Sequence, residues 1–231
     1  MNESFVLTEE NGILTLTMGA EGNNLMTAAF LEGFENIMAE VEKRAAQGGL
    51  KGMIICGSGR HFSVGADVDA LSDRSVKETY DDSTGILPEG HVKQKHAFTF
   101  LRSLPFPVVS AVTGFCIGSG SEIAVNSHYR IVEKTARVGQ PESTFGILPA
   151  LGGVARTIDI CGMKTAYELV MTGELIAADR AYEIGWADIF AEKKQSAAEA
   201  VKLIEFIAEN YSEFDGSQYK KYIAEYKRGL Q

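Results

Sequence analysis

The sequence has few cysteines, few prolines and no long apolar run. Its 231 residues include 3 Cys and 5 Pro. Cys56, Cys116 and Cys161 lie far apart and form no C-x-x-C pair, which argues against a zinc ribbon and against a disulfide framework. We therefore expect three reduced thiols. Charged residues or prolines interrupt every apolar run before the roughly 20 residues that a membrane span requires, so no membrane contact is expected.

Basic charge is also scarce. The chain has 22 Lys+Arg against 31 Asp+Glu, a formal net charge of −9. A protein of that charge repels phosphate backbones, which argues against a general nucleic-acid binder. The first residues lack the basic and apolar regions of a secretion signal, so we expect a cytoplasmic location. The overall composition, with 45% hydrophobic and 23% charged residues, is typical of a soluble globular protein.

Several motifs of large enzyme classes are missing. No Gly-Lys pair occurs, which excludes a P-loop, and neither Gly57–Gly59 nor Gly118–Gly120 completes G-x-G-x-x-G. The G-x-S-x-G nucleophile elbow is absent as well. The four histidines form no H-E-x-x-H pattern, so we expect no metal site.

Strand-like and helix-like segments alternate along most of the chain. Asn11-Gly12 between two short β-type runs predicts a hairpin. Residues 27–46 have helical spacing with Thr27 as N-cap, and the wholly apolar Met53–Ile55 predicts a strand buried on both faces. We also expect strands at 107–113 and 129–133, and helices at 91–104, 154–161, 164–172, 178–184, 196–209 and 217–227. The pattern predicts one α/β domain with a helical C-terminal third.

Three segments carry candidate chemistry: residues 61–68 (HFSVGADV), 111–124 (AVTGFCIGSGSEIA) and 138–153, which contains VGQPE and FGILPALGG. Two of them place small residues where a strand ends, so that a ligand can approach unpaired backbone N–H groups. Two such N–H groups can hold a developing oxyanion. Glu122 and Glu142 add a carboxylate pair, which acid–base chemistry next to a carbonyl requires.

In this order, the segments resemble the enoyl-CoA hydratase/isomerase family, the crotonase superfamily. That family shares an F-(S/A)-x-G-A-D-(L/V/I) turn, a G-x-x-x-G-G-G-x-E-(L/I)-A helix start and a P-E…G-(I/L)-x-P-x-x-G-G segment. The similarity runs from about residue 3 to residue 190. It implies an α/β fold made of a spiral of ββα units, with a core at 1–190. A helical segment of the same domain follows at 191–231, shorter than is usual for the family.

The resemblance implies an acyl-CoA thioester substrate, with coenzyme A as part of the substrate and no separate cofactor. Ala66 and Ser119 match the two N–H donors to the thioester oxygen. Val64 matches the residue whose carbonyl accepts from the adenine amino group, and Asp67 belongs to the same substrate-binding turn. Homotrimers or dimers of trimers are usual in the family, so we expect one of these assemblies.

The resemblance also assigns roles to the two glutamates. Glu122 matches the residue that orients and activates water, and Glu142 matches the one that exchanges the proton at Cα. Because both are present, hydration of a 2-enoyl-CoA, or the reverse dehydration, is favoured. An isomerase, a specialised hydratase, a hydrolase or a decarboxylase of the same fold are alternatives. A non-catalytic acyl-CoA-binding homologue is an alternative of another class. We expect residues 71–90 and 98–101 to line the acyl pocket.

The sequence departs from the family pattern at several places. Ser119 replaces a usual glycine, and its side chain would narrow the pocket or bind substrate. Residues 20–24 are acidic where the family often has a basic residue for the CoA phosphates. These departures leave an acyl group on a carrier protein open as the substrate. Four C-terminal residues either replace the missing basic contact or form a solvated helix face: Lys220, Lys221, Lys227 and Arg228.

Overall fold

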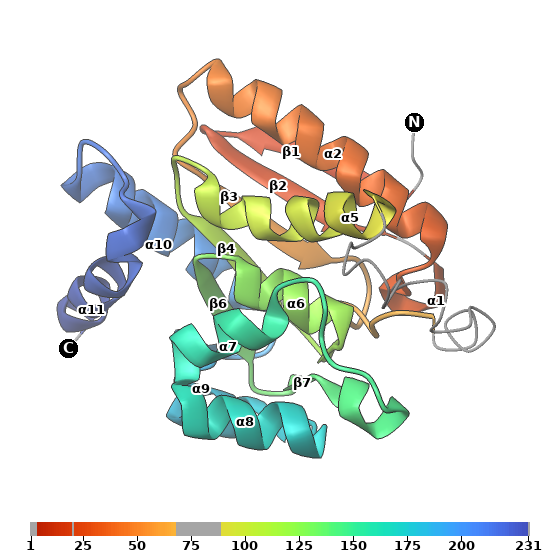
Figure 1. Ribbon diagram of the computed structural model, residues 1–231. Coiled ribbons are helices and arrows are strands. Elements are labelled where there is room, and N and C mark those ends of the chain that lie inside the picture. The colour runs from red at the N-terminus through yellow and green to blue at the C-terminus, as the bar shows by residue number, and fades with distance from the viewer. Residues whose placement is uncertain (1–3, 20, 68–88, 231) are drawn as a thin grey trace.

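Two β-sheets form the framework of the protein (Figure 1). The computed structural model describes residues 4–19, 21–67 and 89–230. The larger sheet has six strands in the order β1-β2-β3-β4-β6-β9, of which β1 and β2 are antiparallel and the following pairs are parallel. These strands are β1 (Phe5–Glu10), β2 (Ile13–Met18), β3 (Gly52–Gly57), β4 (Val108–Val112), β6 (Tyr129–Glu133) and β9 (Ile189–Ala191). The predicted α/β class is confirmed.

The second sheet has three short strands: β5 (Phe115–Ile117), β7 (Arg137–Gly139) and β8 (Ile176–Ala177). β5 and β7 are parallel, and β7 and β8 are antiparallel. None of these strands was predicted from the sequence, and neither was β9. Because each has only two or three residues, hydrophobic periodicity cannot reveal it.

Local sequence preferences explain the first elements of the chain. Asn11 and Gly12 both have positive φ, 53° and 80°, as the predicted two-residue hairpin requires. Helix α2 (Ala28–Ala46) begins after Thr27, whose Oγ1 accepts a hydrogen bond from the N–H of Phe30 at 3.2 Å. The predicted turn and the predicted N-cap are therefore both confirmed.

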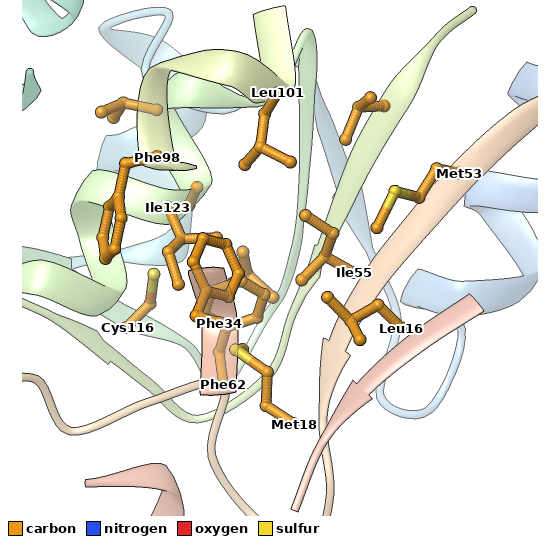
Figure 2. Close-up of a cluster of buried hydrophobic side chains, with 14 of the residues drawn as sticks. Leu16, Met18, Phe34, Met53, Ile55, Phe62, Phe98, Leu101, Cys116 and Ile123 are labelled. Carbon is orange, nitrogen blue, oxygen red and sulfur yellow. The ribbon is translucent and has the colours of Figure 1, made fainter. Parts of the chain in front are cut away.

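The large sheet is covered on both faces, which explains the apolar run in β3. Met53 and Ile55 point into a core beneath α2, α5 (Glu89–Phe100) and α6 (Ser119–Asn126), part of which Figure 2 shows. Ile54 faces the opposite side, where α10 (Ser196–Asn210) and α11 (Tyr219–Gly229) pack. The expectation of a strand buried on both faces is confirmed.

Most of the remaining helical segments lie in the second half of the chain. They are α7 (Gly153–Cys161), α8 (Met163–Thr172) and α9 (Ala178–Glu183), with the short α1 (Glu21–Asn24) and 3₁₀ turns η1 (Leu101–Ser103), η2 (Pro141–Phe145) and η3 (Gly216–Gln218). Within the described ranges, no helix has the length and apolar character to cross a membrane. All three cysteines are free, as expected.

Arg130, in strand β6, is the centre of a buried group of polar contacts. Its side chain is fully buried, and its Nη2 lies 2.5 Å from Oδ2 of Asp188. Its Nε donates to the carbonyl of Trp186 at 2.7 Å, and its Nη1 donates to the carbonyls of Ser127 and His128. All three guanidinium nitrogens thus have acceptors, which is what a buried charge requires.

Two of the C-terminal lysines have partners on the protein itself. Lys220 Nζ donates to the carbonyl of Asp159 at 2.9 Å. Lys227 Nζ lies 4.9 Å from the ring centre of Tyr182, a cation–π distance. Lys220 and Lys227 thus contact the protein itself, which neither alternative, a phosphate contact or a solvated helix face, included.

Candidate active site

The first predicted N–H donor, Ala66, is fixed where β3 leads into a loop. Ser63 donates its N–H to the carbonyl of Phe115 at 3.0 Å and accepts from Ile117 N–H at 3.1 Å, so the loop continues the small sheet. Two residues on, the carbonyl of Gly65 accepts a hydrogen bond from the N–H of Met26 at 2.8 Å. These contacts on both sides hold the backbone next to Ala66.

The second predicted donor, Ser119, is the first residue of α6. It follows Gly118, whose φ of 54° and ψ of −125° favour glycine. Gly65 and Gly118 pack directly together, because a Cβ added to Gly118 would lie 4.0 Å from Cα of Gly65. The structure therefore brings the two donor residues to adjacent positions. Among the residues that the structure describes, none accepts a hydrogen bond from the N–H of Ala66 or Ser119.

Glu122 is buried three residues after Ser119, with 2% of its surface exposed. Its Oε1 accepts hydrogen bonds from the N–H of Leu151 at 2.8 Å and of Gly153 at 2.9 Å. A Cβ on Gly153 would lie 2.8 Å from Oε1 of Glu122, so this contact requires glycine. Burial, together with the charge of Glu142, raises the pKa of Glu122 to about 8, although the two N–H donors lower it.

Glu142 approaches the same place from η2. A Cβ on Gly118 would lie 3.2 Å from Oε1 of Glu142, so this oxygen lies against the start of α6. The other oxygen, Oε2, is buried and has no hydrogen-bond partner among the described residues. Desolvation raises the pKa of Glu142. Two carboxyl groups with raised pKa values thus lie near the start of α6, close to the predicted N–H donors.

The other predicted residues have different outcomes. Val64 and Asp67 are partly buried in the same turn as Ala66. Of the expected acyl-pocket segments, residues 71–88 lie outside the described residues. The expectation that the segment 98–101 lines the acyl pocket is corrected for Phe98 and Leu101. Both side chains are buried in the hydrophobic core, where Phe98 packs on Phe34 with ring centres 5.1 Å apart.

Sequence reasoning missed the backbone donors of Leu151 and Gly153. The Gly-Gly pair at the end of the third segment was part of the motif, but its contact with Glu122 depends on the loop geometry. Asn126 was also missed, although a buried amide four residues after Glu122 on an apolar helix is a signal that can be read. In the described part of the chain, no cluster of His, Cys, Asp and Glu is suited to a metal ion.

The fold and the site define an α/β protein with two neighbouring backbone N–H groups, one buried carboxyl group and one partly buried carboxyl group, an arrangement suited to acid–base chemistry beside a carbonyl. The sequence matches the family model for enoyl-CoA hydratase/isomerase over residues 8–227. The chain belongs to this family, and its fold is the crotonase fold.

Two groups of relatives agree with this assignment. The chain is 32% identical over 194 residues to a fatty acid oxidation complex subunit alpha of Shewanella halifaxensis, and 33% over 190 residues to that of Shewanella oneidensis. These alignments cover 81% and 80% of the chain. The chain spans about a quarter (26%) of the length of these curated relatives.

Solved structures show the same fold at lower identity. Pseudomonas aeruginosa DspI superimposes with a TM-score of 0.79 at 22% identity, covering 90% of this chain and 76% of that one. Bacillus anthracis enoyl-CoA hydratase gives 0.78 at 23%, covering 96% and 90%. A putative enoyl-CoA hydratase from Thermobifida fusca, solved in complex with CoA, gives 0.78 at 21%, covering 100% and 86%.

Proposed function

We propose that the protein adds water across the α,β double bond of a 2-enoyl-CoA thioester, or catalyses the reverse dehydration. The observation that carries this proposal is that Glu122 and Glu142 both lie near the start of α6, beside the N–H groups of Ala66 and Ser119, for which no described residue is an acceptor. The CoA complex of the Thermobifida fusca relative supports CoA as the thioester carrier. The Shewanella relatives support a role in fatty acid oxidation. The trimeric assembly remains a prediction.

The N–H groups of Ala66 and Ser119 would bind the thioester oxygen. In the transition state negative charge moves from Cα toward this oxygen, so donors already in place stabilise the charge more than they stabilise the substrate. Both N–H groups belong to backbone that is held by the packing of Gly65 on Gly118. Oxyanion donors of this kind contribute about 10²–10³-fold in rate.

The two carboxyl groups would move the protons. In hydration, Glu122 takes a proton from water as the water oxygen bonds to Cβ, and the π electrons of the double bond move to Cα. Glu142 then gives its proton to Cα, so one O–H bond is broken and one C–H bond is formed. In dehydration Glu142 removes the Cα proton and Glu122 protonates the departing hydroxyl. Both directions need one proton shared by the pair.

This requirement predicts a pH optimum with an alkaline limit near pH 8. Because the pKa of Glu122 is raised to about 8, the pair loses its last proton near that pH. We expect kcat/KM for crotonyl-CoA to decrease above it, measured as initial rates in buffers from about pH 6 to about pH 10. A rate that does not change over this range would contradict the assignment.

An isomerase is the second candidate, and the protonation of the pair favours it specifically. Since the pKa of Glu122 is raised to about 8, much of Glu122 is protonated at pH 7, and Glu142 is the other carboxyl group of the site that can serve as the base. One base that removes a proton at Cα and returns it at Cγ is enough to move a double bond.

The first test is the reaction of the purified protein with crotonyl-CoA, followed by loss of the enoyl-thioester absorbance. Loss of absorbance with formation of 3-hydroxybutyryl-CoA is the expected result. No reaction with crotonyl-CoA, together with conversion of a 3-enoyl-CoA to the 2-enoyl isomer, would replace hydration by isomerisation. No reaction with either thioester would contradict both proposals.

A further inference from the structure

Asn126, the last residue of α6, makes two hydrogen bonds beneath the candidate site. It is fully buried and lies four residues after Glu122, on the same face of the helix. Its Nδ2 donates to the carbonyl of Glu122 at 2.9 Å and to the carbonyl of Leu151 at 3.1 Å. Two carbonyl acceptors can only face the NH₂ end of an amide, so the chemistry fixes how this side chain is oriented.

The bond to Leu151 links Asn126 to the loop that supplies the donors to Glu122. The N–H of Leu151 donates to Oε1 of Glu122 at 2.8 Å, while its carbonyl accepts from Asn126. A Cβ on Gly152 would lie 3.4 Å from both polar atoms of the Asn126 amide, so the loop lies directly on this side chain. Figure 1 shows α7, which begins at Gly153, next to α6.

We propose that Asn126 is a positioning residue that holds the loop so that the N–H groups of Leu151 and Gly153 stay directed at Oε1 of Glu122. The consequence of this positioning for catalysis rests on the proposed function, because the position of the loop affects catalysis only if Glu122 exchanges protons. The geometric part is independent of that assignment, since it concerns two backbone N–H groups.

The proposal predicts the direction in which the pKa of Glu122 changes when the loop is no longer held. The two N–H donors stabilise the ionised form of Glu122 and lower its pKa, and Lys95 on α5 acts in the same direction. Burial and Glu142 act in the opposite direction. His91 on α5 lies beside the backbone of Ala150, in the same loop. Loss of the donors removes one stabilising contribution and leaves the others, so the pKa of Glu122 must rise further.

Ser127 provides a matched control for a purely structural role. It follows Asn126 in the sequence and is equally buried. Its hydroxyl donates a hydrogen bond to the carbonyl of Ile123 in the same helix and shares a second hydrogen bond with the hydroxyl of Ser110, which is distant in sequence. That distant bond leads to strand β4 and not to the loop. Ser127→Ala is therefore expected to weaken packing without changing Glu122.

The test uses Asn126→Leu, which keeps the approximate volume but removes the donor. Hydrogen exchange of the Leu151 and Gly153 amides, followed by NMR, is expected to accelerate about tenfold or more. With crotonyl-CoA, kcat should fall while KM changes little. The alkaline limit of activity should move up by about one pH unit, as loss of a hydrogen bond to a charged group predicts. Ser127→Ala should change none of these.

Unchanged exchange of both amides in Asn126→Leu would overturn the proposal, as would an activity loss expressed only in KM. If that variant does not fold, Asn126→Ser is measured in the same way, with the same criteria. Should the wild-type protein not hydrate crotonyl-CoA, the proposed function fails by itself. The exchange rates and a carbon-13 NMR titration of the Glu122 carboxyl would still decide the positioning role.

Discussion

Glu142→Gln is expected to lower kcat for crotonyl-CoA by about 10²–10⁴-fold with little change in KM, the range in which a positioned acid or base contributes. Glutamine has nearly the shape of glutamate but does not carry the proton that must reach Cα. Glu122→Gln should have a similar effect. Its amide oxygen can still accept from Leu151 and Gly153, so the loop should remain in place. The measurement is the steady-state rate of loss of the enoyl-thioester absorbance.

Glu168→Gln is the control for this pair, because Glu168 is an exposed carboxylate on α8. It should retain the wild-type rate. Full turnover by Glu142→Gln would eliminate the acid–base assignment. If Glu122→Gln loses hydration but still interconverts 2-enoyl and 3-enoyl thioesters, the isomerase has a single base, Glu142, and the hydratase needs both groups.

Arg130→Met is expected to lower the free energy of unfolding by about 3–5 kcal/mol, the usual cost of removing one member of a buried ion pair. The substitution leaves the carboxylate of Asp188 without its charge partner. It also leaves the carbonyls of Trp186, Ser127 and His128 without the guanidinium donors described above. Methionine fills part of the space but donates no hydrogen bond. Urea unfolding followed by circular dichroism measures the change as a lower midpoint.

Arg180→Met tests whether the loss of stability expected for Arg130→Met depends on the burial of the ion pair. Arg180 and Glu183 form an exposed pair, 3.4 Å apart, with side chains 57% and 65% exposed. Exposed pairs contribute about 0–1 kcal/mol, so this variant should unfold near the wild-type midpoint. An equal loss in both variants would mean that the buried centre has no special stabilising role.

Much of the fold follows from local sequence. The Asn11-Gly12 turn, the Thr27 cap and the buried Met53–Ile55 strand each depend on neighbouring residues, and all three are confirmed. The small sheet could not be predicted in the same way. Its strands are too short for a hydrophobic pattern to reveal them, and they pair between separate parts of the chain, β5 with β7 and β7 with β8.

The candidate site could likewise be predicted only in part from the sequence. Ala66, Ser119, Glu122 and Glu142 were recognised from ordered motifs, and the structure brings them together. The contacts that tune Glu122 could not be recognised, because they join α6 to a loop about thirty residues later in the chain. Contacts between distant segments depend on tertiary geometry, which a single sequence does not specify by spacing.

The burial of Glu122 lowers the free energy of unfolding of the whole protein as the pH rises. In the unfolded chain this carboxyl ionises near its ordinary pKa of 4.5, whereas in the folded protein the value is about 8. Folding at neutral pH therefore takes up a proton, and each pH unit between these values removes about 1.4 kcal/mol of stability. The loss begins above the unfolded pKa and is complete only beyond the folded one. The hydrophobic core on both faces of the sheet must offset this loss, and a change that stabilised the ionised form of Glu122 would raise stability at neutral pH while lowering the pKa that the proposed chemistry uses.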